Sequence, residues 1–509
     1  MDSSKQIKFG ALMGYFAIVV NIVAGLVYTP WMIDKIGQAN YGLYTLATSL
    51  ITMFIMDFGM SAAVSRFVSI YNAKGDRKGA DDFMGLVYKL YLTVDTVILV
   101  ALTIMYFFID KVYKNLSPEE VIVFKRLFII VAIYSIVQFP FMNLNGILTA
   151  HEKFIQLKAC ELFHKIIVIL TVVAALFAGL GVEALVIANA LSGILTILLK
   201  LYIIRKKTPL RANFRYFDKK LVVQIFGFSM WTTVSSLTQR LIFNITPSII
   251  TAVHVSGSVG SALFGLASTI EGYVYTFATA INGMFMPRIS KIIVSGKKET
   301  DLLPLMIKIG RIQILITGLL TIGFIALGKS FVIDIWHKAD FSESYICAVL
   351  LIIPSLFYLP MQIANTTLIV ENKVRLQAII FTIMGVLNVA LSIPFSKWWG
   401  AIGASLSIFI AYSVRNILMA VTHHRVLKLN MFEFIKQTYL KLLPILLITL
   451  GLGFVLEYFN PISNIYIRFL SNGIVFVAVY FVLLWLFGLN DYEKNLFLSV
   501  PKRILKKII

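Results

Sequence analysis

Two kinds of residue in this sequence could do chemistry: a string that resembles a phosphate-binding loop, and charged residues inside apolar stretches. Residues 323–330 read GFIALGKS, which satisfies the pattern G-x-x-x-x-G-K-[ST]. That pattern binds a phosphate only as a loop between a β-strand and a helix, where its backbone amides are free. Here apolar residues fill the loop positions and no strand precedes them. The string therefore predicts no nucleotide chemistry.

The charged residues inside apolar stretches are the stronger candidates. A charged side chain at the centre of a bilayer costs about 3 kcal/mol by insertion scales, so each one needs a partner or a function. Five such residues interrupt apolar stretches, and two arginines stand where a stretch ends: Asp57, Asp95, Arg240, Glu271 and Arg415, with Arg66 and Arg288. Their chemistry depends on the helices that position them.

The composition indicates that these helices cross a membrane. Of 509 residues, 59% are hydrophobic and only 14% are charged, whereas soluble domains have about a quarter of their residues charged. A run of ~20 apolar residues crosses the hydrocarbon layer as a helix. The apolar runs predict 14 spans, at 10–33, 41–68, 84–109, 124–148, 160–180, 182–203, 221–250, 257–289, 306–328, 345–369, 376–397, 400–423, 437–457 and 467–489. The predicted fold class is an all-α polytopic membrane protein.

The distribution of positive charge predicts the orientation of these spans. Of the 46 Lys and Arg, 35 fall on the side of the N-terminus, nine on the other side, and two within helices. The positive-inside rule then places both termini in the cytoplasm. The net charge of +21 is explained by this topology and by attraction to anionic lipids, so no nucleic-acid partner is expected. His423 and His424 are assigned to a solvated basic loop, and no metal site is expected.

Five segments of the first half recur in the second half in the same order, with offsets of 217–222. YGLYTLATSL at 41–50 resembles SALFGLASTI at 261–270, and HEKFIQLKA at 151–159 resembles VENKVRLQA at 370–378. Six helices in each copy give the two copies the same orientation. This is the parallel repeat of many transporters, in which the halves are related by an axis along the membrane normal and the substrate path lies between them.

The repeat predicts four parts in the chain. These are a six-helix bundle at 1–204, a basic cytoplasmic linker at 205–220, a second bundle at 221–424, and two extra helices with a basic tail at 425–509. Pro30 and Pro247 interrupt the first and seventh helices at equivalent places. Matching interruptions are typical of a moving, substrate-lining element, although a tolerated kink explains a single proline as well.

The repeat, the two extra helices and the segment DFGMSAAVSRFVSIYNAKGD at 57–76, preceded by YGLYTL, resemble the multidrug/oligosaccharidyl-lipid/polysaccharide exporter superfamily. The resemblance is strongest to its polysaccharide branch, the Wzx-type flippases. It implies a multi-pass protein of the bacterial cytoplasmic membrane that moves an undecaprenyl-diphosphate-linked oligosaccharide to the outer leaflet for surface polysaccharide biosynthesis. It also implies a cavity lined by helices one, two, seven and eight.

Within that resemblance the intramembrane charges receive roles. Arg240, Arg66 and Arg288 are candidates for binding the diphosphate, because a guanidinium gives two parallel charge-assisted hydrogen bonds. Glu271 is a candidate partner for Arg240, as a structural ion pair or in transport. Asp57 and Asp95 are candidates for conformational coupling, for binding a cation or for pairing. Arg66 and Arg288 also fit a topological role at the interface. Arg415 is assigned a structural role.

No catalytic residue, cofactor or nucleotide is expected, so the membrane potential is the predicted driving force. Outward movement of about two negative charges across 100 mV is favoured by ~4–5 kcal/mol. Exchange with H⁺ or Na⁺ is an additional possibility. The sequence leaves several alternatives open: a peptidoglycan-precursor flippase, a cation-coupled multidrug exporter, a membrane glycan polymerase or a scaffold. The short outer loops argue against a polymerase, and the repeat argues against a scaffold.

Overall fold

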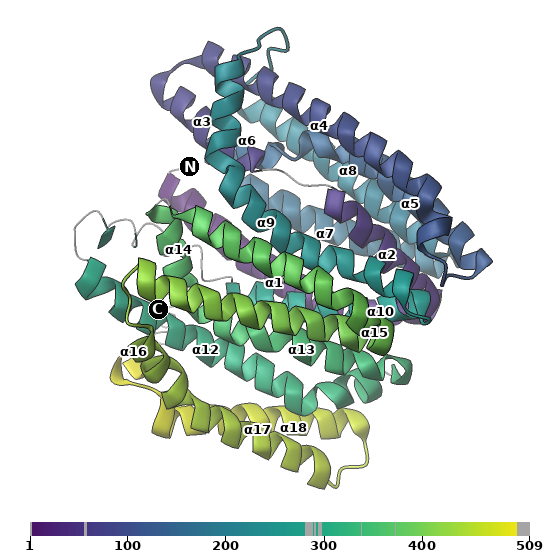
Figure 1. The fold of residues 1–509 in the computed structure, drawn as a ribbon, viewed down its shortest axis with the longest axis vertical. Helices are drawn as coiled ribbons and strands as arrows, with labels where there is room; N and C mark the ends of the chain where they lie inside the picture. The colour runs from purple at the N-terminus through teal and green to yellow at the C-terminus, as the bar shows by residue number, and fades with distance from the viewer. Residues whose placement is uncertain are drawn as a thin grey trace, which may run out of the picture. The chain divides into compact units, whose positions relative to one another are not determined.

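A computed structural model of the full chain describes residues 3–54, 59–279, 289, 292–293, 298–336, 338–371 and 373–495. Every regular element in these ranges is a helix (Figure 1). Nine helical stretches of this described part are long and apolar enough to cross a membrane. The chain is therefore a multi-pass helical membrane protein. The count of 14 spans stays a prediction.

The helices form two compact units, which we describe separately. The first unit comprises residues 1–269 and 374–411. It contains α1 (Ser3–Ile36), α2 (Gln38–Phe54), α3 (Met60–Lys74), α4 (Arg77–Val112), α5 (Pro118–Gln138), η1 (Phe139–Phe141), α6 (Leu144–Ala150), α7 (Phe154–Phe177), α8 (Val182–Lys207), α9 (Lys219–Val253) and the first halves of α10 (Gly257–Thr279) and α15 (Val374–Val426). Here α7 packs against α8 and α1, while α2 packs against both α5 and α9.

The second unit comprises residues 270–373 and 412–509. Besides the second halves of α10 and α15, it contains α12 (Lys298–Ser330), η3 (Phe331–Ile335), η4 (Ala339–Phe341), α13 (Ser342–Tyr358), η5 (Leu359–Met361), α14 (Gln362–Val370), α16 (Met431–Ile435), η6 (Lys436–Leu440), α17 (Lys441–Phe459), α18 (Ile465–Leu483) and η7 (Leu484–Gly488). This unit is built around α12, which packs against α13, α17 and α18. An apolar core that includes Leu315, Leu446 and Phe476 joins α12 to the two C-terminal helices.

Several predicted spans are interrupted, each at a residue that explains the break. The predicted helix 41–68 is not continuous, because Gly59 has a left-handed backbone (φ 69°) at the start of α3. Glycine adopts this conformation without steric cost. The predicted helices 124–148 and 345–369 each contain a 3₁₀ turn, at Pro140 and Pro360 respectively. Proline has no N–H and clashes with the preceding turn, so an α-helix is disrupted there.

Equivalent places in the two predicted bundles have the same local structure. The turn after α6 is closed by a hydrogen bond from Lys153 N to Leu148 O (2.8 Å), and the turn after α14 by one from Lys373 N to Leu368 O (2.7 Å). Together with the turns at Pro140 and Pro360, these bonds support the repeat in this region. Superposition of the whole bundles, and the predicted division into parts, stay predictions.

The stretch labelled α15 contains both predicted helices 376–397 and 400–423. Trp399 and Gly400 have non-helical backbone angles, with φ of 55° at Gly400. The Ser407 hydroxyl lies 2.5 Å from that of Ser392 and donates to Asn388 Oδ1 at 3.1 Å. Since 15 residues separate the two serines, the second segment folds back along the first. A polar ladder of serines and an asparagine therefore joins two antiparallel helices.

Two details of the sequence interpretation are decided by the helices. The string GFIALGKS lies entirely inside α12, so its amides are part of helical structure and form no phosphate loop. The prediction of a solvated loop at His423 and His424 is wrong. Both residues lie in the last turn of α15, and the His423 side chain is buried. The free energy gained by packing the end of the helix outweighs the cost of burying the His423 imidazole.

Candidate functional site

Polar contacts join the two predicted bundles at the end opposite the basic loops. The loop after α4 and the start of α5 belong to the first predicted bundle, and α9 and α10 belong to the second. The Asn115 amide donates to Ala252 O at 2.9 Å, and Tyr113 Oη lies 2.7 Å from Ser248 Oγ. Glu120 accepts from the Ser258 hydroxyl with one carboxylate oxygen.

Glu120, which makes one of these contacts, also caps α5. Glu120 and Ser117 form a capping box at the start of α5, because Glu120 accepts from Ser117 N (2.8 Å) while its own N–H donates to Ser117 Oγ (3.2 Å). A capping box satisfies backbone N–H groups that a helix start otherwise leaves free. The same carboxylate thus caps α5 and binds α10.

Close backbone packing accompanies the polar contacts. A Cβ atom on Gly42 of α2 would lie 1.8 Å from the carbonyl oxygen of Ser258, and one on Gly265 would lie 2.6 Å from Thr45 Oγ1. Gly42 and Gly265 belong to the two repeated segments at 41–50 and 261–270. The corresponding helices of the two predicted bundles therefore meet directly, and only small residues allow this approach.

A second candidate site is a buried charge cluster in the second unit. Glu271 of α10 and Arg415 of α15 have only 8% and 2% of their surfaces exposed. Arg415 and Ser355 are the electrostatic and hydrogen-bonding partners of the Glu271 carboxylate. Glu271 thus has a cationic neighbour other than Arg240, which the sequence analysis had proposed as its partner. That cation is the arginine to which the sequence analysis gave only a structural role.

Aromatic rings surround the guanidinium of Arg415. Its Cζ lies 4.0 Å from the ring centroid of Tyr358 and 4.2 Å from that of Tyr412. Its Nε and Nη2 donate to Asn416 Oδ1 at 3.2 and 3.0 Å, and the Asn416 amide donates to Pro354 O at 2.9 Å. Cation–π contacts favour a desolvated guanidinium. The cluster therefore keeps a charged pair inside an apolar bundle.

Asp95 is a third buried charge, on α4 in the first unit. It is 7% exposed, and its Oδ1 has no hydrogen-bond partner among the described residues. Ser135 of α5, which packs against α4, also has a buried hydroxyl without a hydrogen-bond partner in the described part of the chain. A buried polar atom without a partner costs free energy, which is typical of a group that changes partner or protonation.

The other predicted residues are placed as follows. Arg66 is exposed on α3 near the Phe67 ring, 5.9 Å from its centroid. Asp57 and Arg288 lie outside the described residues, and Arg240 lies in α9 with its side chain outside the described part. Pro30 and Pro247 lie inside α1 and α9. Their proposed substrate-binding, coupling and hinge roles stay predictions.

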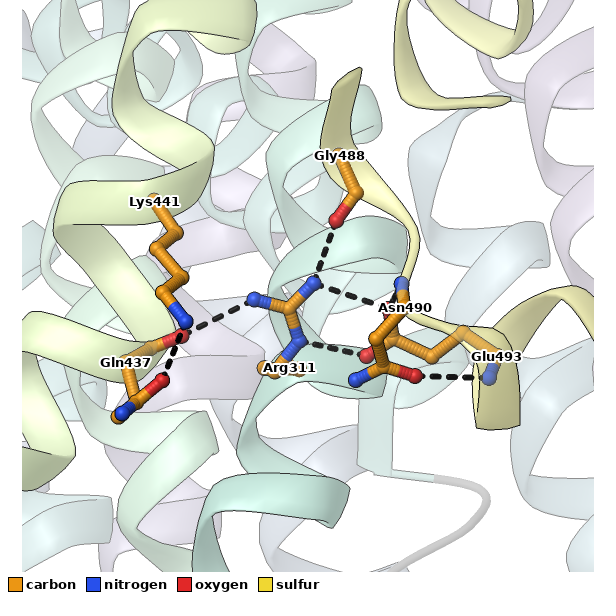
Figure 2. A network of polar contacts seen from close by, with 6 residues as sticks. All are labelled: Arg311, Gln437, Lys441, Gly488, Asn490 and Glu493. Carbon is orange, nitrogen blue, oxygen red and sulfur yellow. Dashed lines mark hydrogen bonds and ion pairs between the residues drawn. The ribbon is translucent and has the colours of Figure 1, made fainter. Parts of the chain in front are cut away.

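The sequence analysis missed one buried ion pair, between Arg311 of α12 and Glu493 after α18 (Figure 2). Arg311 Nε and Nη2 donate to the two Glu493 carboxylate oxygens at 2.6 and 2.9 Å. Nη1 donates to Gln437 O (3.0 Å), and Nη2 also donates to Gly488 O (2.6 Å). Asn490 holds the carboxylate in place, since its N–H donates to Glu493 Oε2 at 3.0 Å. We call these residues the Arg311 clasp.

The clasp connects α12 to the ends of both C-terminal helices. Gln437 lies in η6, just before α17, and Gly488 lies in η7, directly after α18. Arg311 was not singled out because it stands at the predicted inner end of a span, where an arginine usually has a topological role. Its partner follows 182 positions later, so no local pattern connects the two.

Comparison with known proteins identifies the family. The model of the family described as "Polysaccharide biosynthesis protein" matches residues 10–293. The chain belongs to this family. A curated relative, the uncharacterized membrane protein EpsK of Bacillus subtilis (strain 168), is 21% identical over 415 residues, covering 79% of this chain and 80% of EpsK.

Solved structures extend this assignment to the fold. One similar structure is a lipid II flippase, MurJ, in an inward closed conformation, with a TM-score of 0.66 at 17% identity. The match covers 94% of this chain and 97% of the MurJ chain. An inward-facing MATE-family multidrug resistance transporter has a TM-score of 0.63 at 17% identity. The match covers 82% of this chain and 98% of the transporter chain. The family member described here thus has the fold of this exporter superfamily, and the predicted resemblance to its polysaccharide branch is confirmed. It is a membrane protein of the polysaccharide-biosynthesis family.

Proposed function

We propose that the protein flips an undecaprenyl-diphosphate-linked oligosaccharide repeat unit from the cytoplasmic to the outer leaflet of the bacterial cytoplasmic membrane. Both termini lie in the cytoplasm in this proposal, and the flipped unit supplies surface polysaccharide biosynthesis. Membership in the polysaccharide biosynthesis family, together with the flippase-like fold, supports the substrate class. No nucleotide, metal or catalytic residue takes part, and the membrane potential draws the diphosphate outward.

The observation that carries the transport mechanism is the set of hydrogen bonds from the first predicted bundle to α9 and α10. Glu120, Asn115 and Tyr113 of the first bundle bind α9 and α10 of the second, at the end we assign to the outside. These hydrogen bonds and glycine contacts lie beside the packing of α2 against α9. Alternating access requires such a contact to break when the carrier opens outward.

A deletion strain tests the function. Lipid-linked repeat units should accumulate on the cytoplasmic leaflet and surface polysaccharide should disappear, both measured after extraction and glycan labelling. Complementation with the wild-type gene is the control. Normal surface polysaccharide in a strain without a second flippase would overturn the proposal.

A cross-link tests the mechanism. In the double variant Glu120→Cys and Ser258→Cys, a short bis-methanethiosulfonate cross-linker should stop transport by forming a disulfide with each cysteine. A reductant, which cleaves these disulfides, should restore it. Each single variant treated in the same way is the control. Full transport by the cross-linked double variant would show that this end does not open.

A lipid II flippase is the second candidate, because the MurJ fold covers 94% of the chain whereas the multidrug transporter covers 82%. Growth of a strain depleted of its own lipid II flippase separates the two functions. Rescue of growth by this gene would favour the peptidoglycan precursor, whereas rescue of only a polysaccharide-flippase mutant would favour the first proposal.

A further inference from the structure

The basic segment between α8 and α9 is an ordered strap fixed to the start of α4. Arg211 N donates to Asp81 Oδ1 at 2.6 Å, and Asn213 N donates to Asp81 O at 2.9 Å. The Asn213 amide donates to Asp82 Oδ1 at 2.6 Å. We call residues 205–220 the strap. This range includes the last residues of α8 and the first residues of α9.

The strap lies very close to α4 and cannot shift along it. A Cβ atom on Gly85 would lie 1.8 Å from Asn213 O, so α4 offers a bare backbone where the strap crosses it. At the edges of this contact, Arg77 Nη2 donates to Pro209 O and Lys89 Nζ donates to Tyr216 O, each at 3.0 Å. Thr208 and Leu210 point inward and are buried. The outward side of the strap therefore has a fixed position.

The acidic residues that hold the strap do not neutralise its positive charge. Asp81 and Asp82 accept from amide groups, so the cations of the strap remain available. The strap contains seven Lys and Arg and a single Asp, and all seven cationic residues are exposed: Arg205, Lys206, Lys207, Arg211, Arg215, Lys219 and Lys220. Asp218 is occupied in capping α9 through Lys220 N at 2.8 Å.

Two aromatic side chains project from the same segment. Phe214 and Phe217 are 54% and 65% exposed, although the strap immediately joins two membrane helices. Exposed rings beside a dense set of cations are unfavourable in water but suit the headgroup region of a bilayer. There, apolar rings enter the acyl boundary while basic residues contact anionic phosphates.

We propose that the strap is a docking surface for anionic phospholipids of the adjacent leaflet, with the rings of Phe214 and Phe217 inserted between their headgroups. The choice of leaflet rests on the proposed topology, in which this face is cytoplasmic. Because the strap is hydrogen-bonded to α4 and leads directly into α9, lipid bound there would fix the start of both helices at the membrane surface.

A fluorescent label on the strap tests the proposal. The full chain with Phe217→Cys is labelled with an environment-sensitive fluorophore and placed in nanodiscs of phosphatidylcholine alone or with phosphatidylglycerol. The native Cys160 and Cys347 are buried, so the fluorophore reacts with the introduced cysteine. With phosphatidylglycerol we expect a blue-shifted emission and stronger quenching by nitroxide lipids with a shallow label. The matched control is Ala73→Cys at the exposed end of α3, which should emit as in water.

Charge variants identify the lipid contact. Arg211→Gln with Arg215→Gln in the labelled chain should remove the phosphatidylglycerol-dependent quenching, whereas Lys74→Gln with Lys78→Gln should leave it unchanged. Equal emission in both lipids, or quenching that requires added lipid diphosphate, would overturn the proposal. This readout needs no transport, so a failure of the flippase proposal would leave the lipid contact standing.

Discussion

Two buried arginines of the second unit are held in opposite ways. Arg311 donates to both oxygens of Glu493 and to two backbone carbonyls, so four hydrogen bonds fix its guanidinium (Figure 2). Arg415 lies between two tyrosine rings and donates to a neutral amide, with Glu271 as an electrostatic neighbour. Both guanidinium groups are buried and hydrogen-bonded, but the partners differ: a carboxylate and two carbonyls for Arg311, ring faces and an amide for Arg415. We expect the Arg311 contacts to serve stability and the Arg415 cluster to serve transport.

The largest effect is expected at the clasp. Arg311→Ala leaves the Glu493 carboxylate buried and unpaired, and breaking a buried pair costs about 3–5 kcal/mol. We expect most of the protein to be lost from the membrane and the remainder to unfold at a clearly lower temperature. Abundance and thermal unfolding in detergent measure this.

Two matched variants sharpen the result at the clasp. Arg311→Lys should recover only part of the stability, because lysine lacks the planar fork. Arg311→Leu combined with Glu493→Leu should recover more than either single change, because no charge remains unpaired. A fully stable Arg311→Ala protein would contradict the structural role.

The second effect concerns transport through the cluster around Arg415. Glu271→Gln retains the shape of the side chain and an oxygen for the Ser355 hydroxyl but removes the charge. We expect transport to fall about tenfold or more, equivalent to ~1.4 kcal/mol in the barrier, with membrane abundance unchanged. Flipping assayed in proteoliposomes, normalised to protein, measures this.

The double change decides between transport and structure at this cluster. Glu271→Gln with Arg415→Met removes both charges and leaves none unpaired. We expect a folded and inactive protein. Normal transport by the double variant would mean that the pair is structural, as the sequence analysis assumed for Arg415.

A smaller effect is expected from the rings around Arg415. Tyr358→Leu removes one cation–π face, which is worth up to about 2 kcal/mol for a desolvated guanidinium. Tyr358→Phe is the matched control, since it preserves the ring. Thermal unfolding should separate the two variants, and equal losses would show that the hydroxyl, rather than the ring face, is what matters.

The smallest effect on stability is expected at Asp95. Its Oδ1 has no hydrogen-bond partner among the described residues, so Asp95→Asn removes a buried charge without breaking a known hydrogen bond at that oxygen. We expect unchanged or slightly higher thermal stability. A loss as large as that of Arg311→Ala would reveal a partner essential to the fold.

The sequence predicted the helical membrane class because that class follows from composition alone. Long apolar runs require helices in a bilayer, whichever helices later become neighbours. The break at Gly400 was predicted between the spans 376–397 and 400–423, whereas the breaks at Pro140 and Pro360 fall inside spans that were predicted as continuous. The resemblance to the exporter family followed from the repeat, the two extra helices and motifs in the predicted helix 41–68 and the residues after it.

The partners of the buried charges could not be predicted in this way. The structure places Arg415 beside Glu271, a neighbour that the sequence did not predict, while the pairing of Glu271 with Arg240 stays a prediction. Arg311 reaches a carboxylate at the other end of the chain. The sequence by itself determined which residues cost free energy in the membrane, because that cost depends on residue type and depth. Only the tertiary structure decided how each cost is offset, because pairing depends on distances of a few ångströms between helices far apart in sequence.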